Sequence, residues 1–338
     1  MKEKNWDMVH YVNVEGSDPS KGFSQFYDPP RYSSGYAALF NTISFMPETH
    51  MLKPYKERVL STYDLLLTMI QQAGINAKEL LAIRKKAIEN TARQKSFPLS
   101  WKLDTSHFTM IPFKGYEAGY KKSEATNLPV LFYDHNKSFS KEVKYFDTYV
   151  PEKIINKAKA YIIPQGWWSV IELLKLNKVK MERLKKDSII EVTAYHIEDM
   201  KSYPKAYEKH HKNFNVEVSG KKEKIQFLKG DYLIYLNQRS NRFIVEMLEP
   251  TGDDSFFSWN FFDAIFQQKE GYSDYRWNDI AVDFLKKNPE VKEKLALKKQ
   301  SDSAFAKNSP AQFNFIYKNS PWYETAHKRY PAYRLEEK

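Results

Sequence analysis

Apolar residues recur at every third or fourth position along residues 55–70, which is the period of an amphipathic helix. The apolar positions are Tyr55, Val59, Tyr63, Leu66, Leu67 and Ile70. A proline before this run and a glycine after it suit the two ends of a helix, so the pattern predicts a helix over residues 54–74. A second helix is expected over residues 76–95, with Asn76 and Glu79 as a capping pair.

Alternation of polar and apolar residues, combined with β-branched content, indicates the strands. Residues 42–46 alternate in this way and predict a short strand that ends at Pro47, which places Glu48 just beyond its carboxyl end. Ligands of open α/β sheets bind at the carboxyl ends of strands, so this position is of interest for chemistry. Further strands are expected over residues 161–163, 188–195, 213–218 and 230–236.

The second half of the chain also carries helix signals. A helix is expected after Trp168, and a lysine-rich helix over residues 284–300. Residues 241–248 have the β-branched content of a strand but the asparagine start and proline end of a short helix, so both readings stay open. Asp254 is expected to cap a phenylalanine-rich helix over residues 256–266.

The pattern changes near residue 97, where the two long helices give way to short strands with proline and glycine breaks. We therefore expect two domains, residues 1–96 and 97–338, and an α/β fold class. The second domain is expected to be β-rich, with several helices around an aromatic core.

Composition narrows the class of protein. Of the 338 residues, 42% are hydrophobic and 15% aromatic, which supports a folded core and excludes disorder. There is no cysteine, so disulfides, thiolate zinc sites, iron–sulfur clusters and cysteine nucleophiles are excluded. No apolar run reaches the roughly 18 residues of a membrane span, and the start of the chain lacks the apolar core of a signal peptide.

The formal net charge is +11, but the lysines mostly lie beside aspartate or glutamate, as on solvated helix faces. No nucleic-acid fold signature accompanies them, so we expect no nucleic-acid partner. Glycine-rich phosphate loops and a nucleophile elbow are absent as well.

Histidine is scarce enough for a complete test of metal motifs, because the chain has only 8. None of them has a glutamate three residues later, the spacing expected of a metallopeptidase. The remaining candidate cluster, which we interpret as exposed polar residues in a charged loop, comprises His196, Glu198, Glu208, His210 and His211. The sequence therefore predicts no metal ligands in this chain.

Two neighbouring segments carry a more specific pattern. Residues 30–39 read Pro-Arg-Tyr-Ser-Ser-Gly-Tyr-Ala-Ala-Leu, and residues 46–59 begin Met-Pro-Glu-Thr-His-Met-Leu-Lys. Together they resemble the stretch that bears the catalytic glutamate in bacterial zinc carboxypeptidases, the carboxypeptidase A-like enzymes or funnelins. Residues 164–167, residues 248–250 with 254–255, and residues 259–262 look like parts of the C-terminal extension of some bacterial members.

This resemblance implies a mixed-sheet α/β/α peptidase domain, of which residues 1–96 are a remnant, followed by a β-rich α+β domain. It also implies that a zinc-bound water attacks the C-terminal peptide bond of a peptide substrate. Glu48 matches the glutamate that takes the proton of this water and returns it to the leaving amine. Arg31 is then expected to bind the substrate carboxylate, and Tyr36 to line the substrate pocket.

The zinc ligands of the family, a histidine and a glutamate three residues apart and a later histidine, lie well upstream of this glutamate. Only His10 precedes Glu48 here. We therefore expect the C-terminal portion of a larger enzyme, with zinc in the complete enzyme and neither catalytic zinc nor peptidase activity in this chain alone. The expected partner is the missing N-terminal part of the peptidase domain, and residues 1–75 should show an apolar face that lacks it.

The family is commonly exported, so the resemblance also implies a periplasmic or secreted bacterial protein. A second interpretation is a non-catalytic module that binds peptide or glycan. Its candidate stacking residues are Trp167, Trp168, Trp259, Trp277 and Trp322.

Overall fold

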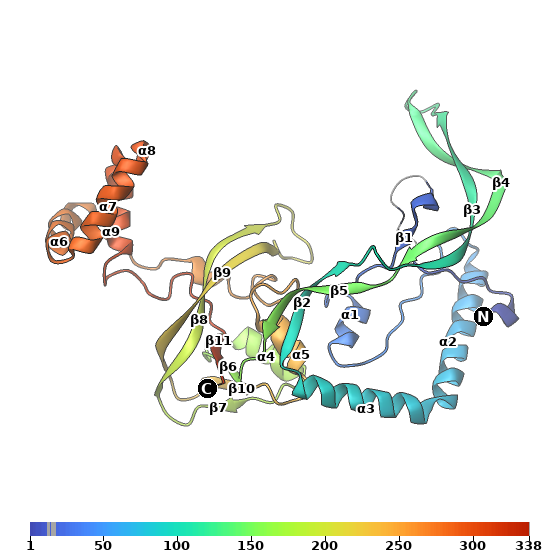
Figure 1. The fold of residues 1–338 in the computed structure, drawn as a ribbon, viewed down its shortest axis with the longest axis horizontal. Coiled ribbons are helices and arrows are strands. Elements are labelled where there is room, and N and C mark those ends of the chain that lie inside the picture. Colours follow the sequence, from blue (N-terminus) through green and yellow to red (C-terminus); the bar gives the residue numbers. More distant parts are fainter. Residues whose placement is uncertain (12–13, 15–17, 338) are drawn as a thin grey trace.

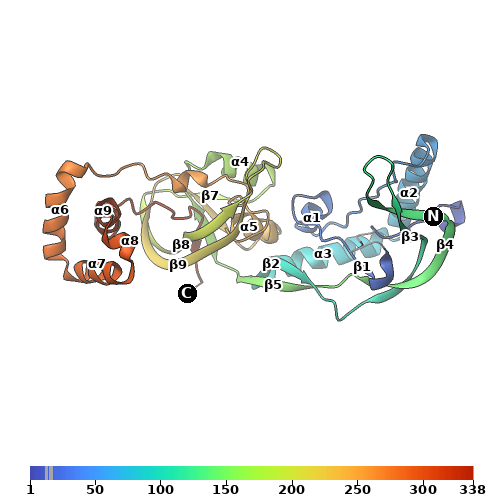
Figure 2. The same ribbon diagram turned by 90° about the horizontal axis from the view of Figure 1, so that it is seen from above.

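The computed structural model describes residues 1–11, 14 and 18–337. The elements are arranged along one long axis (Figure 1, Figure 2). A body of sheet and helices lies in the middle, a long β-arm and helix α2 lie at one end, and a helical module lies at the other.

The body is built on a six-stranded sheet with the strand order β7-β10-β6-β11-β8-β9, in which every pairing is antiparallel. The strands are β6 (Ala160–Ile163), β7 (Glu182–Arg183), β8 (Ser188–Ser202), β9 (Asn213–Phe227), β10 (Tyr232–Tyr235) and β11 (Tyr333–Leu335). The last strand of the chain, β11, lies between β6 and β8. Residues 333–335 are therefore an inner strand of the sheet.

Two helices complete the body, α4 (Trp168–Leu176) and α5 (Asn241–Leu248). Nearly all of α5 is buried, because it crosses the main hydrophobic core. The largest buried side chains of this core include Phe97, Tyr161, Ile171, Leu174, Phe257, Phe262 and Tyr330. The aromatic rings meet edge to face, as those of Phe262 and Tyr330 do at a centroid distance of 5.0 Å.

A buried ion pair joins β11 to the end of α5. The Arg334 guanidinium and the Tyr161 hydroxyl both donate to the Glu249 carboxylate, and Arg334 Nη2 also donates to the Asn156 carbonyl at 2.7 Å. Arg334 and Glu249 are almost completely buried. A buried carboxylate needs such partners, because desolvation costs more than one ordinary contact returns.

We expect Arg334→Met to destabilise the protein by about 3–5 kcal/mol, because it leaves Glu249 buried without its cation. Urea unfolding followed by fluorescence measures this loss. The double variant Arg334→Met with Glu249→Met should recover most of it. A double variant as unstable as the single one would contradict this account.

The N-terminal part contains α1 (Ser33–Ala38), α2 (Tyr55–Ile75), α3 (Ala77–Arg93) and the short strand β1 (Phe23–Ser24). Two 3-10 helices, Lys2–Lys4 and Pro19–Lys21, precede them, and a third, Asp263–Phe266, lies in the body. A two-stranded ribbon of β2 (Ser96–Leu103) and β5 (Tyr149–Asn156) leads away from the body. The arm consists of β3 (Thr109–Lys122) and β4 (Pro129–Phe146), and β1 pairs with β4 in parallel.

The helical module comprises α6 (Asp274–Lys287), α7 (Pro289–Ser301), α8 (Ser303–Ala306) and α9 (Ser309–Lys318). It has a hydrophobic core of its own around Trp277, Leu295, Phe305 and Tyr317. The segment that leads into the module and the segment that leads out of it lie next to each other. The Glu324 carboxylate of the second accepts a hydrogen bond from the backbone N–H of Lys269 in the first at 3.0 Å.

The α/β fold class and the two long helices are confirmed, with α2 and α3 close to the predicted ranges. The four further strands are confirmed as β6, β8, β9 and β10, and the ambiguous residues 241–248 form a helix. The lysine-rich helix is confirmed over residues 289–300 as α7, whereas residues 284–287 are the end of the separate helix α6, because Pro289 starts a new helix. The predicted capping pair is wrong: the Asn76 side chain donates to the Gln72 carbonyl and does not cap α3.

Two further predictions are wrong. Residues 42–46 have no regular structure, because no described strand lies beside them to accept their backbone hydrogen bonds. Residues 256–266 form turns and a short 3-10 helix, because Asp254 makes ion pairs and does not cap a helix. Within residues 1–95, β1 is the one strand that the structure describes.

The expected boundary at residues 96 and 97 falls at the start of β2, where Phe97 enters the main core. Leu39, from the N-terminal side of this boundary, is buried in the same core. In the part of the chain that the structure describes, no helix is both long and apolar enough to cross a bilayer.

Candidate functional site

The segment that carries the most specific sequence pattern is held firmly against the body. We call residues 27–41 the motif loop. Leu39 is buried in the main core, and the ring of Phe40 stacks on Phe243 of α5 at 5.3 Å. The Tyr36 hydroxyl donates to the side chain of Asn177 beyond the end of α4. The loop is therefore positioned by both helices of the body.

Gly35 allows the tight turn inside the motif loop. A Cβ atom at this position would lie 2.3 Å from the carbonyl oxygens of Asp28 and Pro29, which no side chain tolerates. The Ser34 hydroxyl donates to the Asp28 carboxylate across the same turn. The Ser-Ser-Gly part of the pattern thus has a structural reason in this chain.

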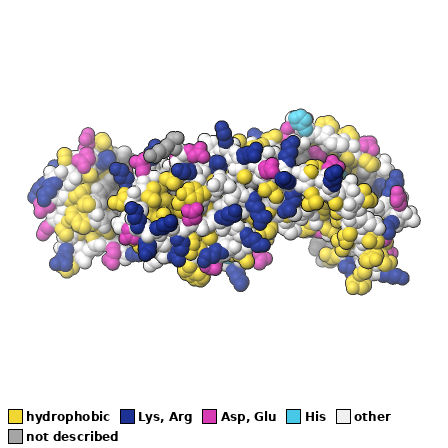
Figure 3. Space-filling model, turned by 90° about the horizontal axis from the view of Figure 1, so that it is seen from below, with side chains coloured by type: hydrophobic (Ala, Val, Ile, Leu, Met, Phe, Trp, Pro, Cys, Tyr) yellow, Lys and Arg dark blue, Asp and Glu magenta, His cyan; other side chains and the backbone are white. Residues whose placement is uncertain are grey.

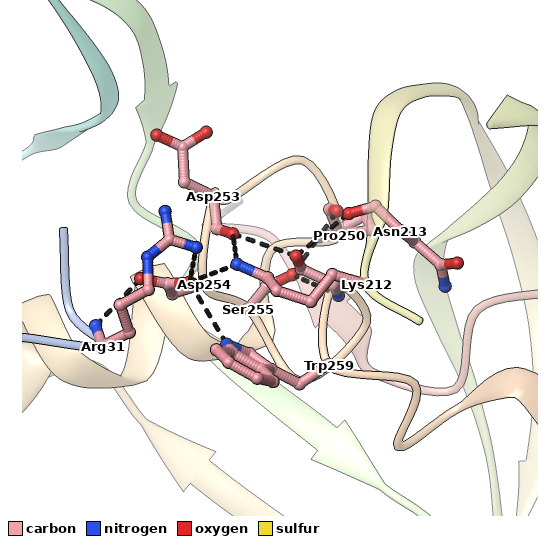
Figure 4. Close-up of polar contacts among 9 residues, drawn as sticks. Arg31, Lys212, Asn213, Pro250, Asp253, Asp254, Ser255 and Trp259 are labelled. Carbon is pink, nitrogen blue, oxygen red and sulfur yellow. Dashed lines mark hydrogen bonds and ion pairs between the residues drawn. The ribbon is translucent and has the colours of Figure 1, made fainter. Parts of the chain in front are cut away.

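The carboxylate of Asp254 is the main anchor of the motif loop (Figure 4). Its side chain is only 2% exposed. Arg31 contacts it twice: the backbone N–H donates to Oδ2 at 2.9 Å, and Nη1 lies 3.1 Å from Oδ1. Trp259 donates its indole N–H to Oδ1 at 3.2 Å. One carboxylate therefore joins residues far apart in the sequence.

Lys212 completes this anchor, which consists of Arg31, Lys212, Asp254 and Trp259. Its Nζ atom lies 2.6 Å from Asp254 Oδ1, 3.2 Å from the Asp253 carbonyl and 4.5 Å from the centre of the Trp259 ring. Burial lowers the pKa of Lys212, although Asp254 opposes this shift. The ammonium group depends on its contacts with the carboxylate and the ring.

The structure assigns Arg31 a structural contact. Its guanidinium is paired with Asp254, although the side chain remains 28% exposed and borders two clefts. Tyr36 lies on the rim of one of these clefts, together with Trp259 and Phe261. The guanidinium of Arg31 thus already has an anionic partner, Asp254. To bind a substrate carboxylate as predicted, Arg31 would have to contact both anions or leave Asp254.

We expect Asp254→Asn to release the motif loop, because it leaves both Arg31 and Lys212 without an anion. The loss of stability should be about 3–5 kcal/mol. Cleavage by trypsin after Arg31 should become faster, which limited proteolysis measures. Asp253→Asn is the matched control, because its backbone carbonyl and not its carboxylate contacts Lys212. Equal cleavage rates for the two variants would contradict the anchoring role.

Glu48 is placed differently. It lies in an exposed irregular segment, residues 42–50, and does not line either of the two clefts that Arg31 borders. The apolar side chains around it are exposed too, and they are Ile43, Phe45, Met46, Met51 and Leu52. Of the contacts between this segment and the motif loop, the one nearest to Glu48 in sequence is that of Met46, whose sulfur accepts from the Ser33 hydroxyl at 3.9 Å.

Helix α2 continues this exposed apolar region (Figure 3). Its predicted apolar stripe faces solvent, with side chains that are 46–74% exposed, namely Tyr55, Val59, Tyr63, Leu66 and Ile70. We call the exposed apolar side chains named in this and the preceding paragraph, which all lie within residues 43–70, the apolar surface. In Figure 3, hydrophobic side chains gather at the end of the molecule that carries α2.

The residues present do not fit a zinc ion. Among the described residues, no group of three or more histidine, cysteine, aspartate or glutamate side chains could hold a metal. His196, from the candidate cluster, instead lies 2.6 Å from the Glu223 carboxylate. No catalytic step through a metal can therefore be derived from this chain's own side chains.

A buried acid that the sequence does not reveal lies behind the motif loop. Glu246 on α5 is only 7% exposed and lines a cleft of about 390 Å³ with Tyr27, Asp28, Trp101 and Arg242. Burial raises the pKa of Glu246 to about 7, and Arg242 only partly opposes this shift. The helical period of residues 241–248 gives the only hint, since it places position 246 among buried neighbours.

Glu246 should make stability depend on pH. Its unfolded pKa is near 4.5 and its folded pKa is about 7, so the folded state binds more protons between these values. Stability must then fall as pH rises from 4.5 to 7. Glu246→Gln removes this cost and should be more stable than the natural chain at pH 8 by on the order of 2 kcal/mol. Urea unfolding at pH 5 and pH 8 measures it.

The matched control is Glu172→Gln, which removes an exposed carboxylate on α4. Its stability relative to the natural chain should not change with pH over this range. A Glu246→Gln variant that is destabilised equally at both pH values would contradict the shifted pKa.

The five tryptophans proposed for stacking differ in position. Trp277 is buried in the helical module, Trp167 packs edge to face on Phe262, and Trp259 belongs to the Asp254 anchor. Trp168 and Trp322 are exposed.

Comparison with family models, with curated proteins and with solved structures gave no significant match for this chain.

Proposed function

We propose that this chain is the C-terminal portion of a zinc metallocarboxypeptidase, which removes C-terminal residues from peptides once a partner segment supplies the zinc ligands. The motif that resembles the carboxypeptidase A-like family supports it, and the observation that carries it is the apolar surface around Glu48. A periplasmic or secreted location, as in that family, is part of the proposal.

Exposure of the apolar surface to water is energetically unfavourable. Each fully buried aliphatic or aromatic side chain contributes about 1.5–3 kcal/mol relative to an exposed one, and five such residues line one face of α2 alone. Helices of this pattern normally bury their stripe. A partner that covers α2 would also cover residues 43–52 and enclose Glu48.

Enclosure would change the chemistry of Glu48. Burial beside a cation-bound water would adjust the proton affinity of this carboxylate for general base catalysis. The required zinc ligands would come from the partner, since the described residues of this chain do not assemble them. Arg31 would act as a positioning residue, because Asp254 holds it.

The test begins with the chain as it exists in its source cells. We expect it to be recovered, within one polypeptide or as a complex, together with a segment that carries a histidine and a glutamate three residues apart. That assembly should contain one zinc ion per chain by elemental analysis and release C-terminal residues from peptides. The isolated chain should do neither. Zinc and turnover in the isolated chain would refute this division of roles.

Glu48→Gln in the assembly should lower kcat by at least about 100-fold, the usual contribution of a general base, and leave zinc content unchanged. Glu57→Gln is the matched control, because Glu57 is an exposed glutamate nearby on α2. Peptide binding without hydrolysis in every form of the protein would instead favour a non-catalytic binding module.

A further inference from the structure

A cleft with several cationic side chains lies where the motif loop meets α3 and the end of α4. Its volume is about 230 Å³. The cations are Arg84 from α3, Lys178 directly after α4 and Arg239 directly before α5, and no aspartate or glutamate is among the described residues that line the cleft. All three cationic side chains are exposed, so an anion from solution can reach them.

The positive charges of this cleft are not neutralised. Neither Lys178 nor Arg239 makes a side-chain hydrogen bond or an ion pair with a described residue. Arg84 has neutral partners only: its Nε donates to the Asn41 carbonyl and its Nη2 to the Thr42 hydroxyl, each at 3.2 Å. These contacts hold the guanidinium beside the motif loop without cancelling its charge. Three like charges in one cleft repel one another, and a bound anion relieves that repulsion.

Lys178 also occupies a backbone position that favours another residue. It follows α4 in the left-handed region, with a φ of 56°. The Val179 N–H donates to the Leu174 carbonyl at 3.0 Å, which is the arrangement in which a helix end normally carries glycine. The Cβ atom of a lysine is unfavourable there. Helix termination alone would therefore favour glycine, whereas lysine gives the cleft a cation.

The rest of the cleft wall is apolar and aromatic. The rings of Tyr36 and Phe40, which belong to the motif loop, lie 5.3 Å apart between their centres. Ile88 of α3 and Leu176 of α4 line the cleft as well, and Leu176 is 75% exposed. An anion that carries an apolar or aromatic group can therefore bury this group against the wall.

A phosphoryl group matches the charge of this cleft better than a carboxylate. The single charge of a carboxylate would leave two of the three cations without a partner. A phosphomonoester carries nearly two negative charges at neutral pH and has three terminal oxygens, one for each cation. Guanidinium groups bind such oxygens with paired hydrogen bonds. The small volume of the cleft favours a free small molecule over a segment of polypeptide.

We propose that this cleft binds a small-molecule phosphomonoester of an apolar or aromatic alcohol. The phosphoryl group lies between Arg84, Lys178 and Arg239, and the apolar part lies against Tyr36 and Phe40. The bound ligand would connect α3 and the motif loop to the end of α4. This inference does not depend on the proposed peptidase activity.

The experiment uses the full chain and phenyl phosphate as the probe, with binding measured by titration calorimetry at neutral pH. We expect saturable binding at one site, which weakens as sodium chloride is added, because salt screens exposed charges. Inorganic phosphate lacks the ring and should bind at least about fivefold more weakly. Benzoate carries a single charge and should bind at least about tenfold more weakly. Phenol, which is uncharged, should not bind.

Arg239→Gln and Lys178→Gly should each weaken the binding of phenyl phosphate by about tenfold or more, the usual contribution of a charged hydrogen bond. Lys178→Gly should also raise the unfolding temperature, because glycine suits the left-handed position. Lys175→Gln is the matched control, since it removes the same charge from the end of α4 but Lys175 does not line the cleft. Its affinity for phenyl phosphate should equal that of the natural chain.

Three results would overturn the proposal. They are the absence of saturable phenyl phosphate binding, equal affinity in the natural chain and both cleft variants, and equal affinity for phenyl phosphate and benzoate. A peptide with phosphotyrosine is the last arm of the experiment. Tighter binding of this peptide than of phenyl phosphate would overturn the assignment to a small molecule, and weaker binding would support it.

Discussion

The motif loop is held in place by one buried carboxylate with several partners. Asp254 is removed from water, and an isolated charge in that position would be prohibitively costly. Arg31, Lys212 and Trp259 together supply charge and hydrogen bonds that offset the cost. These partners come from three separate parts of the chain, so the anchor forms only when the body has folded. The position of the motif loop therefore reports on the state of the whole body.

Local periodicity predicted the elements whose stability is mostly local. The ranges of α2 and α3 follow from apolar spacing, and β8 and β10 follow from β-branched residues. The prediction of a strand over residues 42–46 was wrong, because alternation of polar and apolar residues specifies a strand only if a neighbouring strand exists. Asp254 resembled a helix cap because caps are read from nearby residues, whereas its partners lie 42 and 223 positions away.

The candidate residues show the same limit. Arg31 stands in the motif, but sequence alone gives no sign that Asp254 occupies its guanidinium. Glu246 could not be recognised from the sequence, because an acid on a short helix is normally exposed and its burial here depends on the tertiary packing of α5. Glu48 differs again, since its surroundings in this chain are solvent and exposed apolar side chains. Its role depends on what covers them.

The helical module illustrates a different kind of organisation. Its two connections to the body lie next to each other, and its hydrophobic core is separate from that of the body. The packing of the module therefore does not depend on β11 or on the Asp254 anchor. Evolution could equally exchange this segment for another of similar entry and exit spacing while preserving the rest of the architecture.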